Sequence, residues 1–206
     1  SQSRFYENII GRSEAFISLI FPKIKELFPE QFENVSAHDF YLAVNKAEPS
    51  LIRTEADELT YSMHIMVRYE IEKRLMDGSL STKDLPNEWN RLYKEYLGID
   101  VPCDSMGCLQ DSHWSGGALG YFPSYSLGSA YGAQFLHKMK QDIDIDKLVS
   151  ENRIDEVTAW LTEKIHKYGM LLTPAQLIEN ACGEEFNADY YIEYLTEKYN
   201  KIYDLK

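Results

Sequence analysis

Hydrophobic residues recur at intervals of three and four along most of the chain, which is the spacing of one face of an α-helix. The pattern predicts a first helix over residues 5–27, which ends near Pro29, and a long helix over residues 54–77. No segment alternates convincingly between apolar and polar residues over more than four positions, so the fold class is predicted to be all-α. Further helices are expected over residues 84–98, 119–140, 144–150 and 153–168, and from Thr173 and Asn187 onward.

The chain of 206 residues is 44% hydrophobic, which is enough for one substantial core. It contains no internal repeat, low-complexity tract or clear linker, so residues 1–206 are interpreted as a single helical domain or part of one. The sequence begins at Ser1 without an initiator methionine and enters a helical pattern almost at once. We therefore expect a chain that was cut or trimmed from a longer protein.

The charge balance excludes some classes of partner. The formal net charge is −12, and basic residues are diluted among more numerous acids, so neither nucleic acid nor an anionic membrane is an expected partner. No apolar run approaches the roughly 20 residues that cross a bilayer, and no signal peptide opens the chain. The three cysteines are an odd count without a CxxC pair, which favours a reduced, cytoplasmic protein.

The histidines do not form a zinc-binding pattern. A zinc hydrolase needs about three protein ligands, commonly two histidines on one helix face and a carboxylate. None of the five histidines lies four residues from another, and no HExxH motif is present. The residues alone therefore predict no self-contained metal site in this chain. The five are His38, His64, His113, His137 and His166.

A polar stripe follows the long predicted helix beside its apolar side. At helical spacing Arg53, Asp57, Thr60, His64 and Arg68 share one face. One interpretation is a solvated face with ion pairs between successive turns. The other is the wall of a cleft, in which an arginine binds a carboxylate with two hydrogen bonds.

Polar residues and glycines concentrate in the loop that precedes the helix expected over residues 119–140. The expected loop spans residues 98–117, and a loop of this length in a compact domain is usually functional or disordered. It holds Gln110, Asp111 and His113. Tyr121 and Tyr125 follow one helical turn apart. These side chains are either a chemical site or, for the tyrosines, ordinary packing residues, and their chemistry alone favours neither.

Three segments in the correct order carry a resemblance to a known family. The run Ser1–Arg4 continues into Glu7 and resembles the end of a HESQSR motif, Ile52–Asp57 matches IRxxAD, and Gly107–Trp114 matches GxxQDxHW. The similarity continues through Gly120–Pro123. The chain thus resembles the carboxypeptidase Taq (M32) metallocarboxypeptidases over its whole length.

The resemblance implies a mostly helical, cleft-shaped enzyme that hydrolyses the C-terminal peptide bond of peptides. Such enzymes are usually homodimeric and cytoplasmic, and they bind zinc, or sometimes another divalent metal, through HExxH and a downstream glutamate. That glutamate belongs to HESQSR and would directly precede Ser1. The resemblance therefore predicts that this chain holds the substrate side of the site, lacks the metal ligands and is inactive alone.

The resemblance also suggests roles for residues of the long helix and the segment before it. Arg53, from IRxxAD, is expected to bind the terminal carboxylate of a peptide substrate, a contact that defines an exopeptidase. Asp57 is expected either to orient Arg53 or only to cap the helix. His64 is expected to be a hydrogen-bonded structural histidine.

The other motif supplies the expected catalytic residues. His113 and Tyr121 resemble the pair that related enzymes place against the tetrahedral intermediate, where they donate hydrogen bonds to the developing oxyanion. Tyr125 is a second candidate for that donor. Gln110 and Asp111 are expected to hold His113 in its tautomer and position.

Two other functions compete with this interpretation. A stand-alone acidic helical module that binds peptides or proteins without catalysis would have a finished surface at its N-terminus. A fragment of an enzyme would instead expose an apolar groove or associate with another copy. An endopeptidase or dipeptidase is the third possibility, and the complete IRxxAD and GxxQDxHW motifs argue against it.

Overall fold

The computed structural model describes residues 1–205, and these residues form helices and loops without a β-strand. The all-α prediction is confirmed. The chain divides into two compact units. The first consists of Ser1–Asn45 and the residues from Gly128 onward, and the second is the continuous segment Lys46–Leu127.

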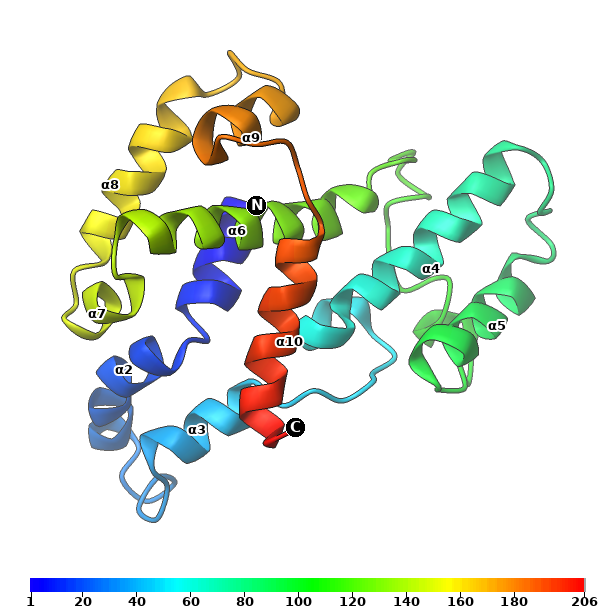
Figure 1. Ribbon diagram of the computed structural model, residues 1–206. Helices are drawn as coiled ribbons and strands as arrows, with labels where there is room; N and C mark the ends of the chain where they lie inside the picture. Colours follow the sequence, from blue (N-terminus) through cyan, green and yellow to red (C-terminus); the bar gives the residue numbers. More distant parts are fainter. Residues whose placement is uncertain (206) are drawn as a thin grey trace. The chain divides into compact units, whose positions relative to one another are not determined.

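The first unit contains most of the helices, and they enclose a core of large apolar side chains (Figure 1). Phe5, Phe135 and Leu161 are almost completely buried in it. Burial of such side chains is the main favourable contribution to folding. Its elements are α1 (Gln2–Arg4), the π-helix η1 (Phe5–Ile10), α2 (Glu14–Leu27), α3 (Ala37–Val44), most of α6 (Pro123–Asp142), α7 (Ile145–Ser150), α8 (Ile154–Lys164), η4 (His166–Tyr168), α9 (Pro174–Cys182) and α10 (Asp189–Tyr203).

The N-terminal helix predicted over residues 5–27 is interrupted. The π-helix ends at Gly11, and Ser13 starts a new helix because its hydroxyl accepts a hydrogen bond of 3.1 Å from the backbone N–H of Phe16. Helix α3 is absent from the predictions, although Ser36 and Asp39 form a capping box at its start. That motif is readable in the sequence.

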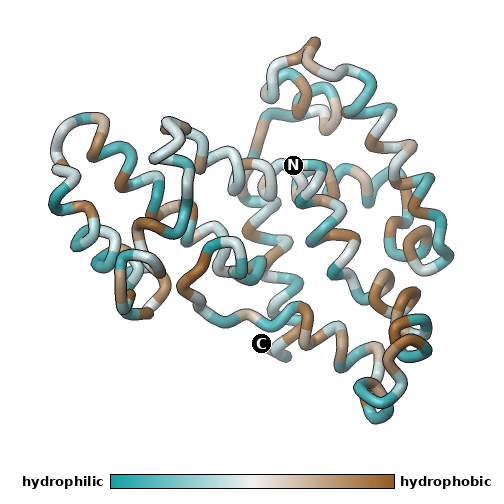
Figure 2. Tube along the Cα trace, turned by 180° about the vertical axis from the view of Figure 1, so that it is seen from behind, coloured by the Kyte–Doolittle hydropathy of each residue, from teal (hydrophilic) through white to brown (hydrophobic). Residues whose placement is uncertain are grey.

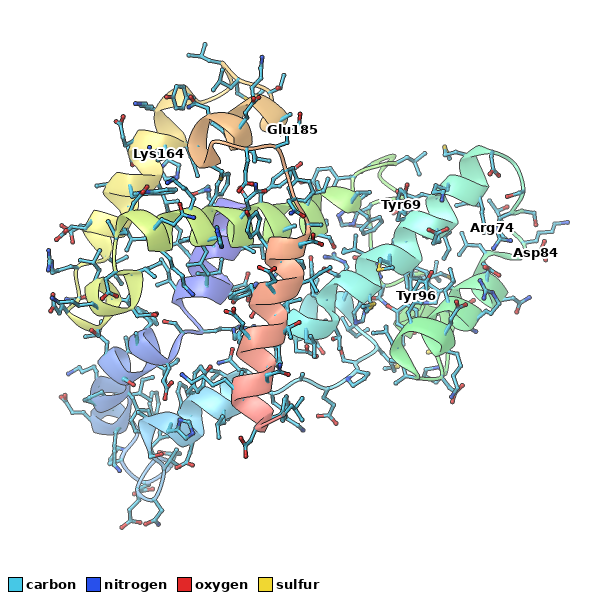
Figure 3. The ribbon with its side chains drawn as sticks, in the orientation of Figure 1. Tyr69, Arg74, Asp84, Tyr96, Lys164 and Glu185 are labelled. Atoms are coloured by element: carbon cyan, nitrogen blue, oxygen red, sulfur yellow. The ribbon has the colours of Figure 1, made fainter. Side chains whose placement is uncertain are left out.

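The second unit is built on a pair of long helices, α4 (Glu58–Met76) and α5 (Leu85–Leu97), which lie side by side (Figure 1). Gly98 ends α5 in the left-handed conformation with φ +73°. Arg74, labelled near the end of α4 in Figure 3, forms an ion pair with Glu88 of α5. Short 3₁₀ turns, η2 (Arg53–Glu55) and η3 (Asp104–Met106), and the first turn of α6 complete the unit.

Helix α4 begins four residues later than predicted. Asp57 occupies its N-cap, where the side chain accepts a hydrogen bond of 2.9 Å from the backbone N–H of Thr60. Arg53 therefore lies on η2, outside the helix. The prediction that Arg53 shares one helix face with His64 and Arg68 is wrong for this reason.

Polar residues occupy much of the buried side of α4. His64, Arg68 and Glu72 are buried, whereas Met66 and Met76 of the same helix are exposed. Figure 2 shows hydrophilic and hydrophobic residues interspersed along the trace. This inversion of the usual pattern marks the interior of the second unit as a place where polar groups are required.

The loop predicted after α5 is present, and it extends beyond residue 117. Helix α6 begins at Pro123 instead of residue 119, because Gly120 adopts a left-handed φ of +74° that interrupts helical geometry. Within residues 1–205, no helix has the length and apolar character needed to cross a membrane.

Candidate functional site

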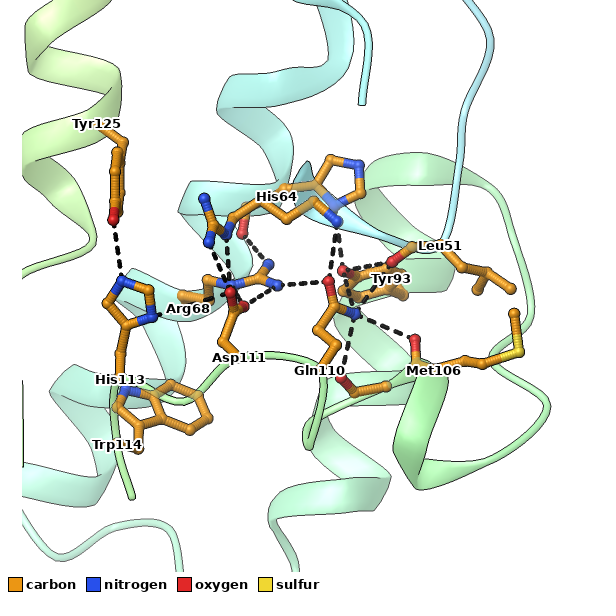
Figure 4. Close-up of polar contacts among 12 residues, drawn as sticks. Leu51, His64, Arg68, Tyr93, Met106, Gln110, Asp111, His113, Trp114 and Tyr125 are labelled. Carbon is orange, nitrogen blue, oxygen red and sulfur yellow. Dashed lines mark hydrogen bonds and ion pairs between the residues drawn. The ribbon is translucent and has the colours of Figure 1, made fainter. Parts of the chain in front are cut away.

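Two buried arginines share one carboxylate in the second unit (Figure 4). One Asp111 oxygen, Oδ1, accepts hydrogen bonds from Arg53 Nη2 at 2.6 Å and Nε at 3.1 Å. The other, Oδ2, accepts from Arg68 Nε at 2.7 Å. The Arg68 side chain is fully buried, and those of Arg53 and Asp111 are 7% and 10% exposed. Two cations and one anion leave a net positive charge on this cluster.

The protonation of this cluster is set by its own charges. Burial alone would raise the pKa of Asp111, but the hydrogen bond from Arg53 and the charge of Arg68 outweigh burial and hold that pKa below its ordinary value. Burial opposes the charge of Arg53 as well, and its hydrogen bond to Asp111 nevertheless raises the pKa of the guanidinium. Asp111 and Arg53 therefore stay ionised near neutral pH.

Gln110 fixes the position of the loop against both arginines. Its Oε1 accepts hydrogen bonds of 2.9 Å from the backbone N–H of Arg53 and from Arg68 Nη2. Its amide nitrogen lies 3.1 Å from the carbonyl oxygens of Leu51 and Gly107, to which it donates. The prediction that Gln110 holds His113 is therefore replaced by a different role, because its bonds join the loop to η2 and α4.

Aromatic side chains surround the Arg53 guanidinium. Its carbon lies 4.9 Å from the centroid of the Tyr125 ring and 5.7 Å from that of Phe122, within the range of cation–π attraction. Its Nη1 donates to the hydroxyl of Tyr61 at 3.1 Å. The contacts to Asp111 and Tyr61 use three of the five N–H donors of the guanidinium. No other acceptor in the described part of the chain binds the guanidinium, so two N–H donors remain for a further acceptor.

The carboxylate of Asp57 serves the start of α4. It accepts hydrogen bonds from the backbone N–H groups of Thr60 at 2.9 Å and Glu48 at 3.0 Å. The alternative that Asp57 caps the helix is therefore confirmed. Asp111, and not Asp57, orients the guanidinium of Arg53.

His113 lies between Asp111 and the aromatic residues. Its Nε2 is 3.0 Å from the Tyr125 hydroxyl, and its buried Nδ1 is 3.9 Å from Asp111 Oδ1 without a hydrogen-bond partner among the described residues. The nearby carboxylate favours the tautomer that carries the proton on Nδ1, in which Nε2 accepts from Tyr125. The His113 ring also packs in a tilted arrangement against Phe122, with 4.4 Å between the ring centroids, which restrains its orientation.

Tyr121 is the most accessible polar aromatic residue of this group. It is 51% exposed, and its ring centroid lies 5.8 Å from that of His113 and 5.4 Å from that of Tyr125. A backbone hydrogen bond of 2.8 Å from the Ala118 N–H to the His113 carbonyl oxygen folds the intervening loop back on itself. His113, Tyr121 and Tyr125 thus come together, whereas the spacing along the chain suggested this only for the two tyrosines.

His64 belongs to the interior of the unit. It is fully buried, and its Nδ1 lies 3.1 Å from the hydroxyl of Tyr93. Burial, with a smaller contribution from the charge of Arg68, lowers the pKa of His64 to about 4. It is a neutral, hydrogen-bonded histidine, as predicted.

The sequence interpretation missed three residues that shape this site. Tyr61 contacts Arg53, Tyr93 contacts His64, and the buried carboxylate of Glu72 holds Trp114. Glu72 lies four residues after Arg68 and so extends the polar stripe of α4 by one turn. This four-residue spacing could therefore have identified Glu72 from the sequence.

The sequence matches the carboxypeptidase Taq (M32) metallopeptidase family over residues 1–199. The chain belongs to this family. It is 48% identical over 204 residues to carboxypeptidase 1 of Bacillus subtilis, an alignment that covers 98% of this chain and 41% of that protein. It is 43% identical to thermostable carboxypeptidase 1 of Pyrococcus furiosus, with 97% and 40% covered.

Solved structures of M32 carboxypeptidases share the fold. The enzyme from Deinococcus radiodurans superimposes with a TM-score of 0.95 at 38% identity, and the match covers 98% of this chain and 41% of that structure. Trypanosoma cruzi metallocarboxypeptidase 1 gives 0.92 at 39% identity, with 96% and 40% covered. The chain thus spans about two fifths of the length of the M32 proteins that it matches.

The family is one of metallopeptidases, so the donor groups of this chain bear on where a metal ion could bind. Residues 1–205 contain no group of three or more His, Cys, Asp or Glu side chains arranged to hold a metal ion. The residues of the candidate site therefore do not fit a metal centre. Their chemistry is that of binding an anion and donating hydrogen bonds.

Proposed function

We propose that this chain is the substrate-binding part of an M32 metallocarboxypeptidase that hydrolyses the C-terminal peptide bond of peptides. The remaining part of a longer polypeptide would supply the HExxH helix and the further glutamate that bind zinc or another divalent metal. The two-fifths coverage of the M32 relatives supports this division of the site. On this proposal the chain is inactive by itself, and the intact enzyme is a cytoplasmic homodimer.

The observation that carries the proposal is the charge of the arginine cluster. Two buried guanidiniums share the single carboxylate of Asp111, in a chain whose net charge is −12. The surplus positive charge attracts an anion, and two N–H donors of Arg53 that no described residue occupies can bind that anion. The terminal carboxylate of a peptide satisfies both requirements, whereas an internal peptide bond is uncharged.

The neighbouring rings provide hydrogen-bond donors for the reacting carbonyl group. Tyr121 is half exposed, so its hydroxyl is the accessible donor to an oxyanion that develops during hydrolysis. In the tautomer described above Nε2 of His113 accepts from Tyr125, so His113 can donate to a substrate oxygen only after the proton moves to Nε2 and the Tyr125 hydroxyl releases that nitrogen. Asp111 holds Arg53 through hydrogen bonds and lies 3.9 Å from His113 Nδ1, so one carboxylate lies next to both the carboxylate-binding and the oxyanion-binding side chain.

The decisive experiment removes Arg53 from the full-length enzyme and compares two matched peptides, one with a free C-terminal carboxylate and one with a C-terminal amide. A charged hydrogen bond of this kind is worth roughly 1.5–3 kcal/mol, so Arg53→Ala should lower kcat/KM for the free acid by about 10- to 150-fold. The amidated peptide should be affected far less, because it carries no charge for Arg53 to bind.

Arg91→Ala is the matched control, since Arg91 lies on the exposed surface of α5 and pairs only with Glu88 and Glu95 of its own helix. It should leave both substrates unchanged. Equal losses on the free acid and the amide after Arg53→Ala would show that Arg53 is structural, and the proposed role would have to be abandoned.

A further inference from the structure

A buried carboxylate on α4 lies behind the segment that carries His113 and Tyr121. Glu72 is 5% exposed, and its Oε1 accepts a hydrogen bond of 2.7 Å from the indole Nε1 of Trp114. The same oxygen accepts from the backbone N–H of Gly120 at 3.2 Å. One atom therefore holds two points of the loop that are six residues apart.

The two held residues are the direct neighbours of the two expected oxyanion donors. Trp114 follows His113, and Gly120 precedes Tyr121. Between them the chain turns back through Gly117 and Gly120, both with left-handed φ values of +77° and +74°. A loop with two such residues has many accessible conformations when it is not restrained. The contacts to Glu72 restrain both of its ends.

Packing reinforces the hold on the first end. The Trp114 ring makes edge-to-face contacts with Trp89 at 6.0 Å and with Phe122 at 5.8 Å. The indole ring is thus fixed in the apolar interior, and only its N–H requires a polar partner. Glu72 supplies that partner, and an apolar side chain in its place would leave two donors unsatisfied.

Glu72 acts here as a hydrogen-bond acceptor and not as half of an ion pair. Among residues 1–205, no lysine, arginine or histidine forms an ion pair with it. The neutral amide of glutamine presents an oxygen in the same place as Oε1 and can accept the same two bonds. The variants Glu72→Gln and Glu72→Leu can therefore separate the loss of the charge from the loss of the hydrogen-bond acceptor.

We propose that Glu72 is a positioning residue of the candidate site: by accepting from Trp114 and Gly120 through one oxygen, it sets the relative placement of His113 and Tyr121. The inference rests on the proposed function where it concerns catalysis. Its structural part concerns this chain alone. Arg53 is held separately by Asp111 and Tyr61, so loss of Glu72 should disturb the oxyanion donors more than carboxylate binding.

The test compares Glu72→Gln and Glu72→Leu with Glu70→Gln as the control, since Glu70 lies on the same helix and pairs with Lys73 on the surface. Side-chain NMR is recorded on this chain under conditions where circular dichroism shows every variant folded. The chain has three tryptophans, so three indole N–H signals are expected, and Trp114→Phe identifies the one that matters. Glu72→Leu should move the Trp114 indole signal and the ring signals of His113 and Tyr121. Glu72→Gln and Glu70→Gln should leave the His113 and Tyr121 ring signals in place.

Kinetics of the full-length enzyme supply the second measurement. Glu72→Leu should lower kcat by about tenfold or more while KM changes less than about twofold, because oxyanion contacts act mainly in the transition state. Glu72→Gln should retain kcat within about threefold, since both acceptor contacts survive. Glu70→Gln should match the unmodified enzyme.

Three results would overturn the inference. The His113 and Tyr121 signals could stay in place in Glu72→Leu, the two Glu72 variants could lose kcat equally, or the loss could follow only the fraction unfolded. If the unmodified full-length protein has no carboxypeptidase activity, the proposed function fails, and the NMR comparison still decides whether Glu72 positions the loop.

Discussion

The two units of this chain bury different kinds of side chain. The interior of the first unit is mostly apolar, with Phe5 and Phe135 among its most buried residues, and the buried polar side chains there are uncharged: Asn8, Asn45 and Gln134. The interior of the second unit also contains apolar residues, but Arg68 and Glu72 are equally enclosed there. The first unit is therefore stabilised by the area that it buries, whereas the second depends on specific partners for its buried charges.

This difference indicates where the chemistry lies. An apolar core tolerates small rearrangements because its attractions are not directional. A buried charge is stable only while its partner stays within hydrogen-bond distance, so it fixes one geometry at a cost in stability. The second unit contains such buried charges around Asp111, next to the candidate substrate-binding groups.

The largest expected loss of stability follows from removing a charge from the interior of the second unit. Asp111→Asn keeps the volume of the side chain but removes the one carboxylate among residues 1–205 that pairs with Arg53 and Arg68. Leaving buried cations unpaired should lower the free energy of unfolding by about 4 kcal/mol. Urea denaturation followed by circular dichroism measures this change.

Asp100→Asn is the control for that experiment. Asp100 pairs with Lys94 at the surface, where an ion pair contributes under about 1 kcal/mol. Similar losses from the two variants would mean that the arginine cluster is not the element on which the second unit depends.

A decrease in pH should have an intermediate effect on the stability of the fold. The pKa of His64 is about 4 in the folded chain, against an ordinary value of 6.5, so the folded state binds fewer protons than the unfolded state between these values. Stability should therefore fall as pH decreases from 6.5 to 4, by roughly 3 kcal/mol. The pKa of Asp111 is lowered from 3.8, so its own contribution is lost only at still lower pH.

Urea denaturation at several pH values checks this window. His64→Gln removes the titrating group and should flatten the stability curve between pH 4 and 6.5. An equally steep curve in that variant would assign the acid sensitivity to other groups.

The smallest effect is expected from a conservative change in the apolar interior. Ile178, 1% exposed in the first unit, loses one methylene in Ile178→Val, which should cost about 1 kcal/mol. The same denaturation assay measures it, and the NMR signals of His113 should not change. If Ile178→Val lowers the free energy of unfolding as much as Asp111→Asn does, the inferred difference between the two interiors is wrong.

Much of the secondary structure could be predicted from local signals. Gly98 ends α5 where the sequence indicated, and Thr173 caps α9. These predictions succeed because caps and left-handed glycines act within a few residues of chain. The predictions failed where local signals compete: Asp57 starts α4 after Arg53, and Gly120 delays α6.

The sequence predicted which residues belong to the candidate site, but not all of the contacts between them. The motifs named Arg53, Asp111 and His113, and these side chains do lie together. One partner was assigned incorrectly, because Gln110 binds the arginines instead of His113. Of the two roles left open for Asp57, the helix cap is the one observed, and Asp111 orients Arg53. Spacing along the chain does not determine which of several carboxylates reaches a guanidinium.

Local sequence patterns are sufficient to show that this protein is helical and acidic and that it carries motifs resembling IRxxAD and GxxQDxHW of the M32 family. Only the folded chain shows that Asp111 lies between two arginines and that one oxygen of Glu72 accepts hydrogen bonds from both ends of the loop. Helix formation depends on neighbours a few residues away, whereas the burial of a charge depends on groups some forty to sixty residues distant that meet only after folding.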